Sequence, residues 1–278
     1  MIQMIAVDMD GTFLDDQKMY DESRFARQFN QIKKQGIKFI VASGNQYIHL
    51  ANYFPGYLED LCFICENGAL IVEQKQVIYE CPLDPILINE LLKLLLEDER
   101  IALDRLILSG EKASYILCHT KKTFIESGKF FYHNLRLVDS LYDLPDKIYK
   151  ITVNFRPEKK EENLETLKAA FQEQANILTS GVKAVDIVSR NAGKEKAIDF
   201  LQNRMGISDR ALACFGDNMN DLGMIKKAAY GFVMGNGKEA LKQHAYKIVG
   251  TNNGQAVLQE IDWILSLWKK DQNTIGLR

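Results

Sequence analysis

The feature that most constrains the fold is an alternation of short apolar runs with longer helical patterns, interrupted once along the chain. Expected strands at residues 2–8, with the apolar run Ile5-Ala6-Val7, and at residues 37–42 flank the segment 21–35. The apolar residues of this segment recur with helical spacing, and Gly36 follows it. A glycine just past the last periodic residue is typical of a helix C-terminus. Strands that alternate with helices predict a parallel sheet with helical crossovers, and therefore an α/β fold.

The alternation changes near Pro82 and returns near residue 186. The segment between these points mixes expected antiparallel strands with helical stretches, which is an α+β pattern. We therefore predict a parallel-sheet core formed by residues 1–81 and 186–278, with residues 82–185 inserted as a separate α+β domain. A length of 278 residues suits one large or two medium domains.

Composition and charge narrow the classes of function. The formal net charge is −2 and the sequence pI is about 6.1, so we expect no binding surface for nucleic acid or for an anionic membrane. No apolar stretch is long enough to span a bilayer, and Asp8 interrupts the first apolar run before it could serve as a signal peptide. We expect a cytoplasmic protein. The oligomeric state is not indicated.

Neither the cysteines nor the four histidines, which are scattered without ligand spacing, indicate a metal site. Five cysteines are an odd number, which does not fit a disulfide framework. Cys62 and Cys65 are spaced like a metal or redox pair, but they lie in an apolar run and no second pair accompanies them. We expect both to pack in the core, as free cysteines commonly do.

Four polar segments, each at the expected end of a strand or start of a helix, carry the candidate chemistry. In a parallel sheet such strand ends lie along one edge, so their side chains can converge on a ligand. The segments are Asp8-Met9-Asp10-Gly11-Thr12, Val41-Ala42-Ser43-Gly44-Asn45, Lys194 after Asn191-Ala192-Gly193, and Phe215-Gly216-Asp217-Asn218-Met219-Asn220-Asp221. Together they predict one polar site at that edge.

The residue types in these segments suit phosphoryl transfer. Asp8, Asp10 and Asp217 supply hard oxygen ligands of the kind that Mg²⁺ prefers. Ser43, the amide of the glycine that follows it, and Lys194 supply hydrogen-bond donors and positive charge for a phosphate. A carboxylate with an ordinary pKa of about 4 is ionised at neutral pH, so it can attack phosphorus without a base and form an aspartyl-phosphate.

Each segment taken alone has a simpler structural interpretation. Asp-Gly is a turn signal, and Ser43-Gly44 is a common turn sequence. Lys194 could be a surface residue of a helix, while Asp217 and Asn218 could be helix caps. Their joint occurrence in this order favours one functional site over four separate structural features.

The four segments, in order, resemble the four motifs of the haloacid dehalogenase-like (HAD) superfamily. The matching residues are Asp8-x-Asp10-Gly-Thr-x-Leu14, Ser43-Gly44, Lys194 and Gly216-Asp217-x-x-Asn220-Asp221. The insertion resembles the C2 (IIB) cap of the Cof-type subfamily in length and pattern. Three further segments are similar to that subfamily: Glu66-Asn67-Gly68-Ala69, Val233-Met234-Gly235-Asn236 and Thr251-Asn252-Asn253-Gly254. The resemblance implies a Rossmann-like core with an inserted cap domain.

The resemblance also implies a role for each motif residue. Asp8 would be the nucleophile and a ligand of Mg²⁺. Asp10 would protonate the leaving alcohol and then activate water, while its backbone carbonyl binds the metal. Asp217 would be the other metal carboxylate. The phosphoryl oxygens would be held by Ser43, Gly44, Lys194 and Asn220. Supporting residues would be Thr12 and Asp221, the latter holding Lys194 or a metal-bound water.

The acid role of Asp10 depends on its surroundings. A second carboxyl group beside the nucleophile can hold a proton if like-charge repulsion or burial favours its neutral form. As residues i and i+2 of an extended segment, Asp8 and Asp10 would point to the same side, toward one phosphate. An acid at this position favours phosphatase or mutase chemistry over dehalogenation, which needs no leaving-group acid.

The expected function is a Mg²⁺-dependent phosphatase that acts on small phosphomonoesters. The variant Ser43-Gly44-Asn45-Gln46-Tyr47 has Asn45 where many family members have Arg, and it resembles a subset of bacterial sugar phosphatases, which favours a sugar phosphate as substrate. We expect the residues that set specificity on loops of the inserted domain, at 109–111, 119–122 or 180–183.

Two other functions stay open at this point. A phosphosugar mutase with the same core would convert a sugar phosphate to its isomer without net release of phosphate. A non-catalytic regulator that binds sugar phosphates could keep the fold, and its expected mark would be the loss of Asp8 or Asp10, which this sequence retains.

Overall fold

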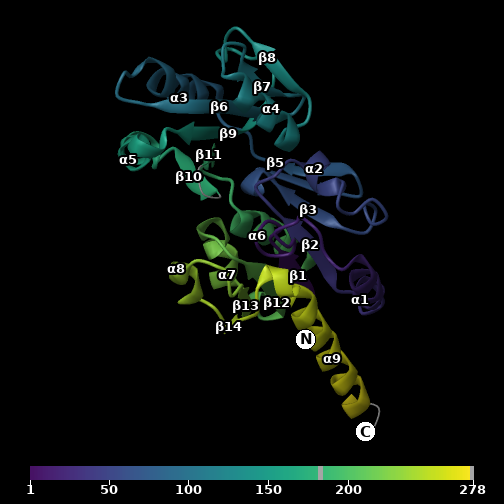
Figure 1. The fold of residues 1–278 in the computed structure, drawn as a ribbon. Coiled ribbons are helices and arrows are strands. Elements are labelled where there is room, and N and C mark those ends of the chain that lie inside the picture. Colours follow the sequence, from purple (N-terminus) through teal and green to yellow (C-terminus); the bar gives the residue numbers. More distant parts are fainter. Residues whose placement is uncertain (181–183, 276–278) are drawn as a thin grey trace. The chain divides into compact units, whose positions relative to one another are not determined.

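The computed structural model describes residues 1–180 and 184–275, which form two compact units (Figure 1). The first unit consists of Met1–Ser43, Glu59–Phe63 and Ile198–Arg278, and the second of Gly44–Leu58 and Ile64–Ala197. These units follow from contacts within the chain, and the domain boundaries expected from the sequence remain a prediction. No helix among the described residues has the length and apolar character needed to cross a membrane.

A mainly parallel sheet forms the core of the first unit, in the order β14-β13-β12-β1-β2-β3. Neighbouring strands from β14 to β2 run parallel, which confirms the expected α/β fold. β1 is buried along its whole length, which explains its unbroken apolar sequence. The strands are β1 (Met4–Val7), β2 (Lys38–Ala42), β3 (Cys62–Cys65, continuing into the second unit), β12 (Leu212–Gly216), β13 (Tyr230–Val233) and β14 (Lys247–Ile248).

The helices of the first unit are α1 (Glu22–Lys34), α7 (Leu222–Lys227), α8 (Glu239–Lys242) and α9 (Ala256–Ile275), while α6 (Lys194–Met205) begins in the second unit and continues into the first. α1 begins where the Asp21 side chain accepts a hydrogen bond from the Arg24 amide, and it is followed by Gly36 at φ +67°. Asp262 of α9 accepts hydrogen bonds from Arg24 and Gln28, so the two helices are joined by polar contacts as well as packing.

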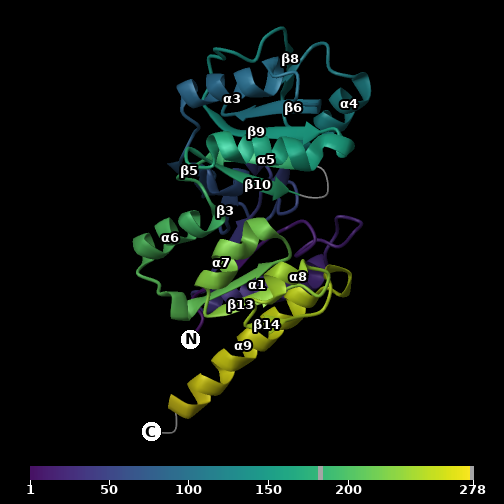
Figure 2. The same ribbon diagram turned by 90° about the vertical axis from the view of Figure 1, so that its left-hand side faces the viewer.

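The second unit is built on a six-stranded sheet in the order β10-β11-β9-β6-β7-β8. Figure 2 shows β10, β9, β6 and β8 of this sheet. Its described pairs are antiparallel except β7 and β8, which run parallel. The strands are β6 (Leu103–Gly110), β7 (Ser114–Leu117), β8 (Leu135–Val138), β9 (Ile148–Phe155), β10 (Ala175–Ser180) and β11 (Ala184–Ser189). This mixture of hairpins and helices agrees with the α+β pattern of the inserted segment.

Apolar side chains of one sheet face pack against two helices of the second unit, α3 (Pro85–Glu97) and α5 (Lys160–Phe171). Leu108 of β6 and Ile151 of β9 are cross-strand partners in this core. The remaining elements of the unit are α2 (Tyr47–Ala51), α4 (Lys122–Phe131) and the antiparallel hairpin of β4 (Leu70–Glu73) and β5 (Gln76–Glu80). The period-two alternation of β6 and β9 thus places Leu106, Leu108, Ile151 and Val153 on one face, whereas Ile107 lies on the other.

Two details of the second unit are only weakly marked in the sequence. β8 has the short sequence Leu-Arg-Leu-Val, which is only partly buried at the edge of the sheet and carries a weak apolar pattern. The turn between β4 and β5 consists of Gln74 and Lys75, which both adopt positive φ. In β3, Cys62 and Cys65 are both buried, so their expected core packing is confirmed.

Candidate active site

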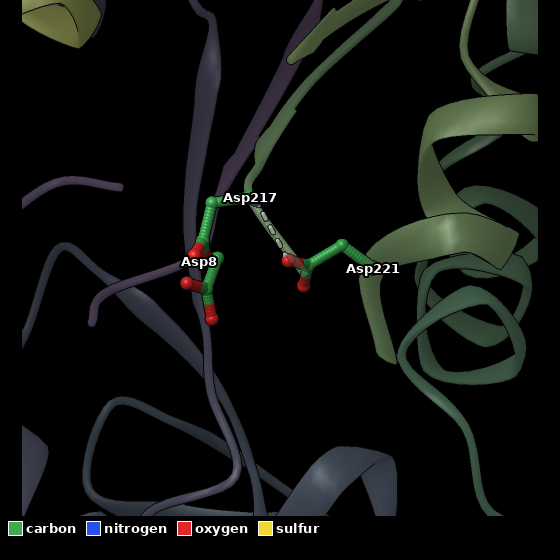
Figure 3. Close-up of side chains that lie close together, drawn as sticks. All are labelled: Asp8, Asp217 and Asp221. Carbon is green, nitrogen blue, oxygen red and sulfur yellow. Dashed lines mark hydrogen bonds between the residues drawn. The ribbon is translucent and has the colours of Figure 1, made fainter. Parts of the chain in front are cut away.

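Two adjacent strand ends bring Asp8 and Asp217 together. β1 and β12 are parallel neighbours with Val7 opposite Phe215, so the residues that follow both strands emerge at the same edge of the sheet. One carboxylate oxygen from each of Asp8, Asp217 and Asp221 lies within 4.8 Å of the other two, and Figure 3 shows the three side chains. Asp8 and Asp221 are buried, which places these like charges in a site with little access to water.

Asp221 is held by the backbone of the loop that carries Asp217. One oxygen of its carboxylate accepts hydrogen bonds from the amides of Asp217 and Asn218, both at 3.0 Å (Figure 3 shows the first). Gly216 makes this approach possible, since a Cβ added there would lie 2.5 Å from Cβ of Asp221. The glycine before Asp217 is therefore required by the packing of the site.

A second set of contacts orients Asp217 from the other side. The buried Thr12 hydroxyl donates to Oδ1 of Asp217 at 3.1 Å. Gly11 precedes it at φ +80°, and a Cβ added there would lie 2.7 Å from Oδ2 of Asp217. The loop after β1 and the loop after β12 thus fit against each other through a hydroxyl and a glycine.

Two asparagines from late in the sequence hold the loop that follows Asp8. Asn236 donates to the Gly11 carbonyl at 2.7 Å and accepts from the backbone amide of Asn252 at 3.0 Å. Asn252 in turn donates to the Leu14 carbonyl at 3.0 Å. In the sequence, these two asparagines could be singled out only because the segments that contain them resemble segments of the Cof-type subfamily. Their role in positioning the loop is visible only in the structure.

Asp10 lies in surroundings that differ from those expected. β1 ends at Val7, and the chain then turns, with the Phe13 amide donating to the Asp8 carbonyl at 3.2 Å. Residues 8–10 are therefore not the extended segment on which the same-side geometry depended. The Asp10 side chain is 45% exposed and lies 2.5 Å from Nζ of Lys18, so the burial considered for it is absent.

The residues expected to bind phosphate are distributed over both units. Ser43 is buried and follows β2, whose Val41 pairs with Val7, so it lies at the same sheet edge as Asp8. Asn220 lies in the single 3₁₀ turn that precedes α7. Gly44 and Lys194 belong to the second unit, where Lys194 is the buried first residue of α6. Their convergence on one phosphate stays a prediction.

The three clustered carboxylates fit a hard divalent cation. Every ligand atom that they offer is a carboxylate oxygen, and these atoms lie close enough together to share one ion that keeps part of its water shell. An all-oxygen donor set favours Mg²⁺, Ca²⁺ or Mn²⁺ over the softer metals that prefer thiolate or imidazole. Asp8, Asp217 and Asp221 are therefore the residues that would hold such an ion.

A pocket of about 220 Å³ opens in the second unit beside the residues that follow Gly44. Apolar and polar side chains both line it, as they do in other small-molecule sites. Gly110 and Glu111, on one of the loops expected to set specificity, line it, whereas residues 181–183 lie outside the described part of the chain. The other lining residues are Gln46, Tyr47, Ile48, Glu66, Leu70, Val72, Lys75, Val77, Lys112, Ala113, His133 and Tyr149.

Comparison with known sequences gives consistent matches over nearly the whole chain. Residues 5–261 match the family model described as haloacid dehalogenase-like hydrolase. The chain is 33% identical over 264 residues to the 5-amino-6-(5-phospho-D-ribitylamino)uracil phosphatase YbjI of Escherichia coli (strain K12), a match covering 95% of this chain and 96% of that protein. It is 22% identical to the Bacillus subtilis (strain 168) phosphatase YitU, whose name states the same substrate, over 95% and 98% of the two chains.

Solved structures show the same architecture. SMU.1108c from Streptococcus mutans UA159 superposes with a TM-score of 0.90 at 31% identity, covering 96% of this chain and all of that one. TM0651 from Thermotoga maritima superposes with a TM-score of 0.76 at 24% identity, which supports the fold alone.

Proposed function

Because the chain belongs to the haloacid dehalogenase-like hydrolases and is a phosphoric monoester hydrolase, we propose that it cleaves small phosphomonoesters with Asp8 as the nucleophile, in a reaction that depends on Mg²⁺. The observation that carries this proposal is the group of carboxylates on Asp8, Asp217 and Asp221 at the ends of β1 and β12. A buried aspartate beside two further carboxylates is suited to phosphoryl transfer, because the group could share a divalent cation with the substrate.

In the first half of the proposed reaction, a carboxylate oxygen of Asp8 attacks phosphorus. The bond between phosphorus and the ester oxygen breaks, and Asp10 delivers its proton to the departing alcohol oxygen. Bound Mg²⁺ would neutralise charge on the phosphoryl oxygens. In this structure Asp10 is exposed and pairs with Lys18, so this ion pair would have to open before the Asp10 carboxyl group could carry that proton to the substrate.

In the second half, water attacks phosphorus of the aspartyl-phosphate. Asp10, now a carboxylate, takes a proton from this water, and the bond between phosphorus and the Asp8 oxygen breaks to release inorganic phosphate. Asp217 keeps its position through Thr12, and Asp221 through the loop amides, so neither needs to move during the cycle. Ser43, Gly44, Lys194 and Asn220 are the proposed donors to the phosphoryl oxygens.

We propose a substrate in which the phosphate is attached to a sugar or a sugar alcohol. Two relatives are named as phosphatases of 5-amino-6-(5-phospho-D-ribitylamino)uracil, a ribityl chain that carries a pyrimidine ring. The pocket beside Gln46, with apolar residues such as Leu70 and Val77, suits a small planar ring. The cytoplasmic location expected from the sequence is part of this proposal.

The nucleophile is tested by Asp8→Asn. We expect hydrolysis of a generic aryl phosphate to fall by at least about 10³-fold, since the variant keeps the shape of the side chain but not the attacking oxygen anion. The matched control is Asp60→Asn, which removes a carboxylate that pairs with Lys33 at the surface of the same unit. Full activity of a folded Asp8→Asn protein would overturn the mechanism.

The substrate class is tested by comparing kcat/KM across a small panel. The panel contains 5-amino-6-(5-phospho-D-ribitylamino)uracil, ribitol 5-phosphate, ribose 5-phosphate and glucose 6-phosphate. We expect the compound with the ring to be preferred by about tenfold, because burying about 60 Å² of ring surface at roughly 25 cal/mol per Å² contributes about 1.5 kcal/mol. Equal kcat/KM values for all four compounds would show that the enzyme does not recognise the ring. Isomerisation of a sugar phosphate without release of phosphate would indicate a mutase instead.

A further inference from the structure

One face of the six-stranded sheet carries buried polar side chains that the proposed mechanism does not use. Ser109 of β6 pairs with Lys150 of β9, and Thr152 of β9 pairs with Asp186 of β11, so all four lie on the same face of the sheet. Ser114 pairs with Ser109 and extends this set, which we call the polar face. All five residues are buried, so each side chain needs a polar partner inside the protein.

The polar face and the segment after β3 hold the loop Gly44–Gln46, residue by residue. Nζ of Lys150 donates a hydrogen bond to the Gly44 carbonyl. The backbone amide of Glu66 donates to the Asn45 carbonyl at 3.1 Å. The Gln46 amide group donates to the hydroxyls of Ser109 and Ser114 at 2.8 and 3.0 Å. Three consecutive residues after Ser43 are therefore fixed by groups of the second unit.

Lys150 and Glu66 form the charged centre of this arrangement. Nζ of Lys150 lies 2.7 Å from Oε2 of Glu66, and the two side chains are only 4% and 3% exposed. The Ser109 hydroxyl donates to the other Glu66 oxygen at 2.5 Å. Glu66 and Asn67 both have positive φ, a conformation that non-glycine residues keep only where their surroundings impose it.

These contacts determine which way the peptide groups of the loop face. The described chain contains no cis peptide bonds, and in a trans peptide the carbonyl and the following amide point in opposite directions. Because the Gly44 carbonyl faces Lys150, the Asn45 amide faces away from it. In the same way, the bond from Glu66 to the Asn45 carbonyl turns the Gln46 amide away from Glu66.

We propose that Lys150 is a positioning residue for phosphate binding, which fixes the Gly44–Asn45 peptide so that the loop after β2 presents its donors to the phosphoryl group. The inference rests on the proposed function, because Ser43 and Gly44 are proposed there as phosphate ligands. It adds a residue of the inserted segment, 106 positions from Gly44 in the sequence, to the determinants of phosphate affinity. Lys150 itself need not touch the substrate.

The test compares two variants in which residue 66 carries no charge, while Asp186 keeps its hydrogen bonds from Asn67 and Thr152. Glu66→Gln keeps Lys150 and its bond to the Gly44 carbonyl, whereas Lys150→Met combined with Glu66→Gln removes that bond. The exposed Lys147 supplies the control Lys147→Met, because it precedes β9 and its ion-pair partners are Glu80 and Glu111. For each folded protein, the dissociation constant of inorganic phosphate is measured by calorimetry with Mg²⁺ present, and KM and kcat are measured for two esters.

We expect the double variant to raise the dissociation constant of phosphate and the KM of both esters by the same factor, about tenfold, as expected for loss of one charged hydrogen bond. Glu66→Gln should change them by less than about threefold. Lys147→Met should leave them unchanged. A common factor for phosphate and for two different esters is the mark of a loop-positioning role, because a contact with the leaving group would separate the esters.

Three outcomes would overturn the inference. An unchanged phosphate dissociation constant in the folded double variant shows that Lys150 does not position the loop. A lower kcat with unchanged KM and phosphate affinity indicates a purely structural role. A KM increase for only one ester indicates contact with the leaving group. If the double variant does not fold, Lys150→Arg decides, since a guanidinium cannot reproduce the ammonium contacts and should weaken phosphate binding about threefold or more.

Failure of the proposed function gives a different result. If the wild-type protein binds phosphate and hydrolyses none of the esters, the function is wrong while the calorimetric comparison still tests Lys150. If the wild-type protein binds no phosphate, both are overturned.

Discussion

Two buried polar clusters in this molecule are built in opposite ways. The first gathers Asp8, Asp217 and Asp221 at the ends of two parallel strands, and its three members would carry the same charge. The second, around Lys150, lies in the middle of antiparallel strands and balances an ammonium group with the carboxylates of Glu66 and Asp186.

This difference in charge balance indicates what each cluster is suited to do. Like charges in a buried site destabilise one another, so such a group is retained where it serves a ligand of opposite charge, here a divalent cation. A balanced pair satisfies itself and holds its neighbours in one arrangement, although its burial contributes little net stability. We therefore expect changes in the first cluster to alter activity, and changes in the second to alter stability and phosphate affinity.

The largest effect is expected for Asp217→Asn. Loss of one carboxylate from the group should lower kcat/KM by about 10³-fold and raise the Mg²⁺ concentration for half-maximal activity, because a metal ligand of high charge density is removed. The measurement is phosphate release as a function of Mg²⁺ concentration. Asp209→Asn, which removes a carboxylate paired with Lys227 in the same unit, is the control. An unchanged Mg²⁺ requirement would contradict the metal assignment.

The next effect separates the two clusters through stability. Lys150→Met should lower the free energy of unfolding by about 3–5 kcal/mol, because it leaves Glu66 as an unpaired buried carboxylate. Breaking the exposed pair of Lys147 and Glu80 with Lys147→Met should cost no more than about 1 kcal/mol. Urea denaturation of both variants gives the comparison. Equal losses would show that the buried pair is not the stronger constraint.

A smaller effect concerns pH. Burial alone would lower the pKa of Lys150, but the carboxylates of Glu66 and Asp186 outweigh burial and raise it above the ordinary 10.5. A raised folded-state pKa gives a stability contribution that is complete below pH 10.5 and is lost as the pH rises toward the folded-state value. The stability gap between the wild-type protein and Lys150→Met should thus stay constant from about pH 7 to 10 and narrow only in stronger alkali. A gap that narrows between about pH 8 and 9 would indicate a buried lysine with a lowered pKa.

The smallest effect is expected at the edge of the first cluster. Lys18 and Asp10 form an ion pair at 2.5 Å, but both side chains are nearly half exposed. Lys18→Met should therefore change the free energy of unfolding by less than about 1 kcal/mol, measured by thermal melting. A loss as large as that of Lys150→Met would mean that exposure does not distinguish the two ion pairs.

Much of the fold could be predicted from the sequence because its signals are local. The helix of residues 22–34 has its N-cap at Asp21 and Gly36 just beyond its end, and the buried strand β1 is an unbroken apolar run. β8 escaped prediction because four partly exposed residues at a sheet edge carry little apolar pattern. Whether a helix or strand is buried on one or both faces determines its pattern of apolar residues. This pattern can therefore be read from the sequence without knowing which elements pack against it.

The candidate site was only partly visible in this way. Strand ends indicated that Asp8 and Asp217 emerge at one edge, and the structure brings them together with Asp221. The position of Asp10 could not be foreseen, because the turn that ends β1 and the contact with Lys18 depend on the three-dimensional course of the loop. The positioning contacts of Asn236 and Asn252 join segments more than 200 residues apart.

By itself, the sequence determined the alternation that makes the α/β fold and the order of the polar segments at its strand ends, because both follow from local burial and local chain direction. Only the tertiary structure decided that Lys150 binds Glu66 and the Gly44 carbonyl. A period-two pattern tells which side chains share a face of a strand, but it does not tell which distant loop will meet that face. Which loop meets the face depends on how the whole sheet packs. The contacts of the buried polar groups show the result, because each of these groups needs a polar partner inside the protein.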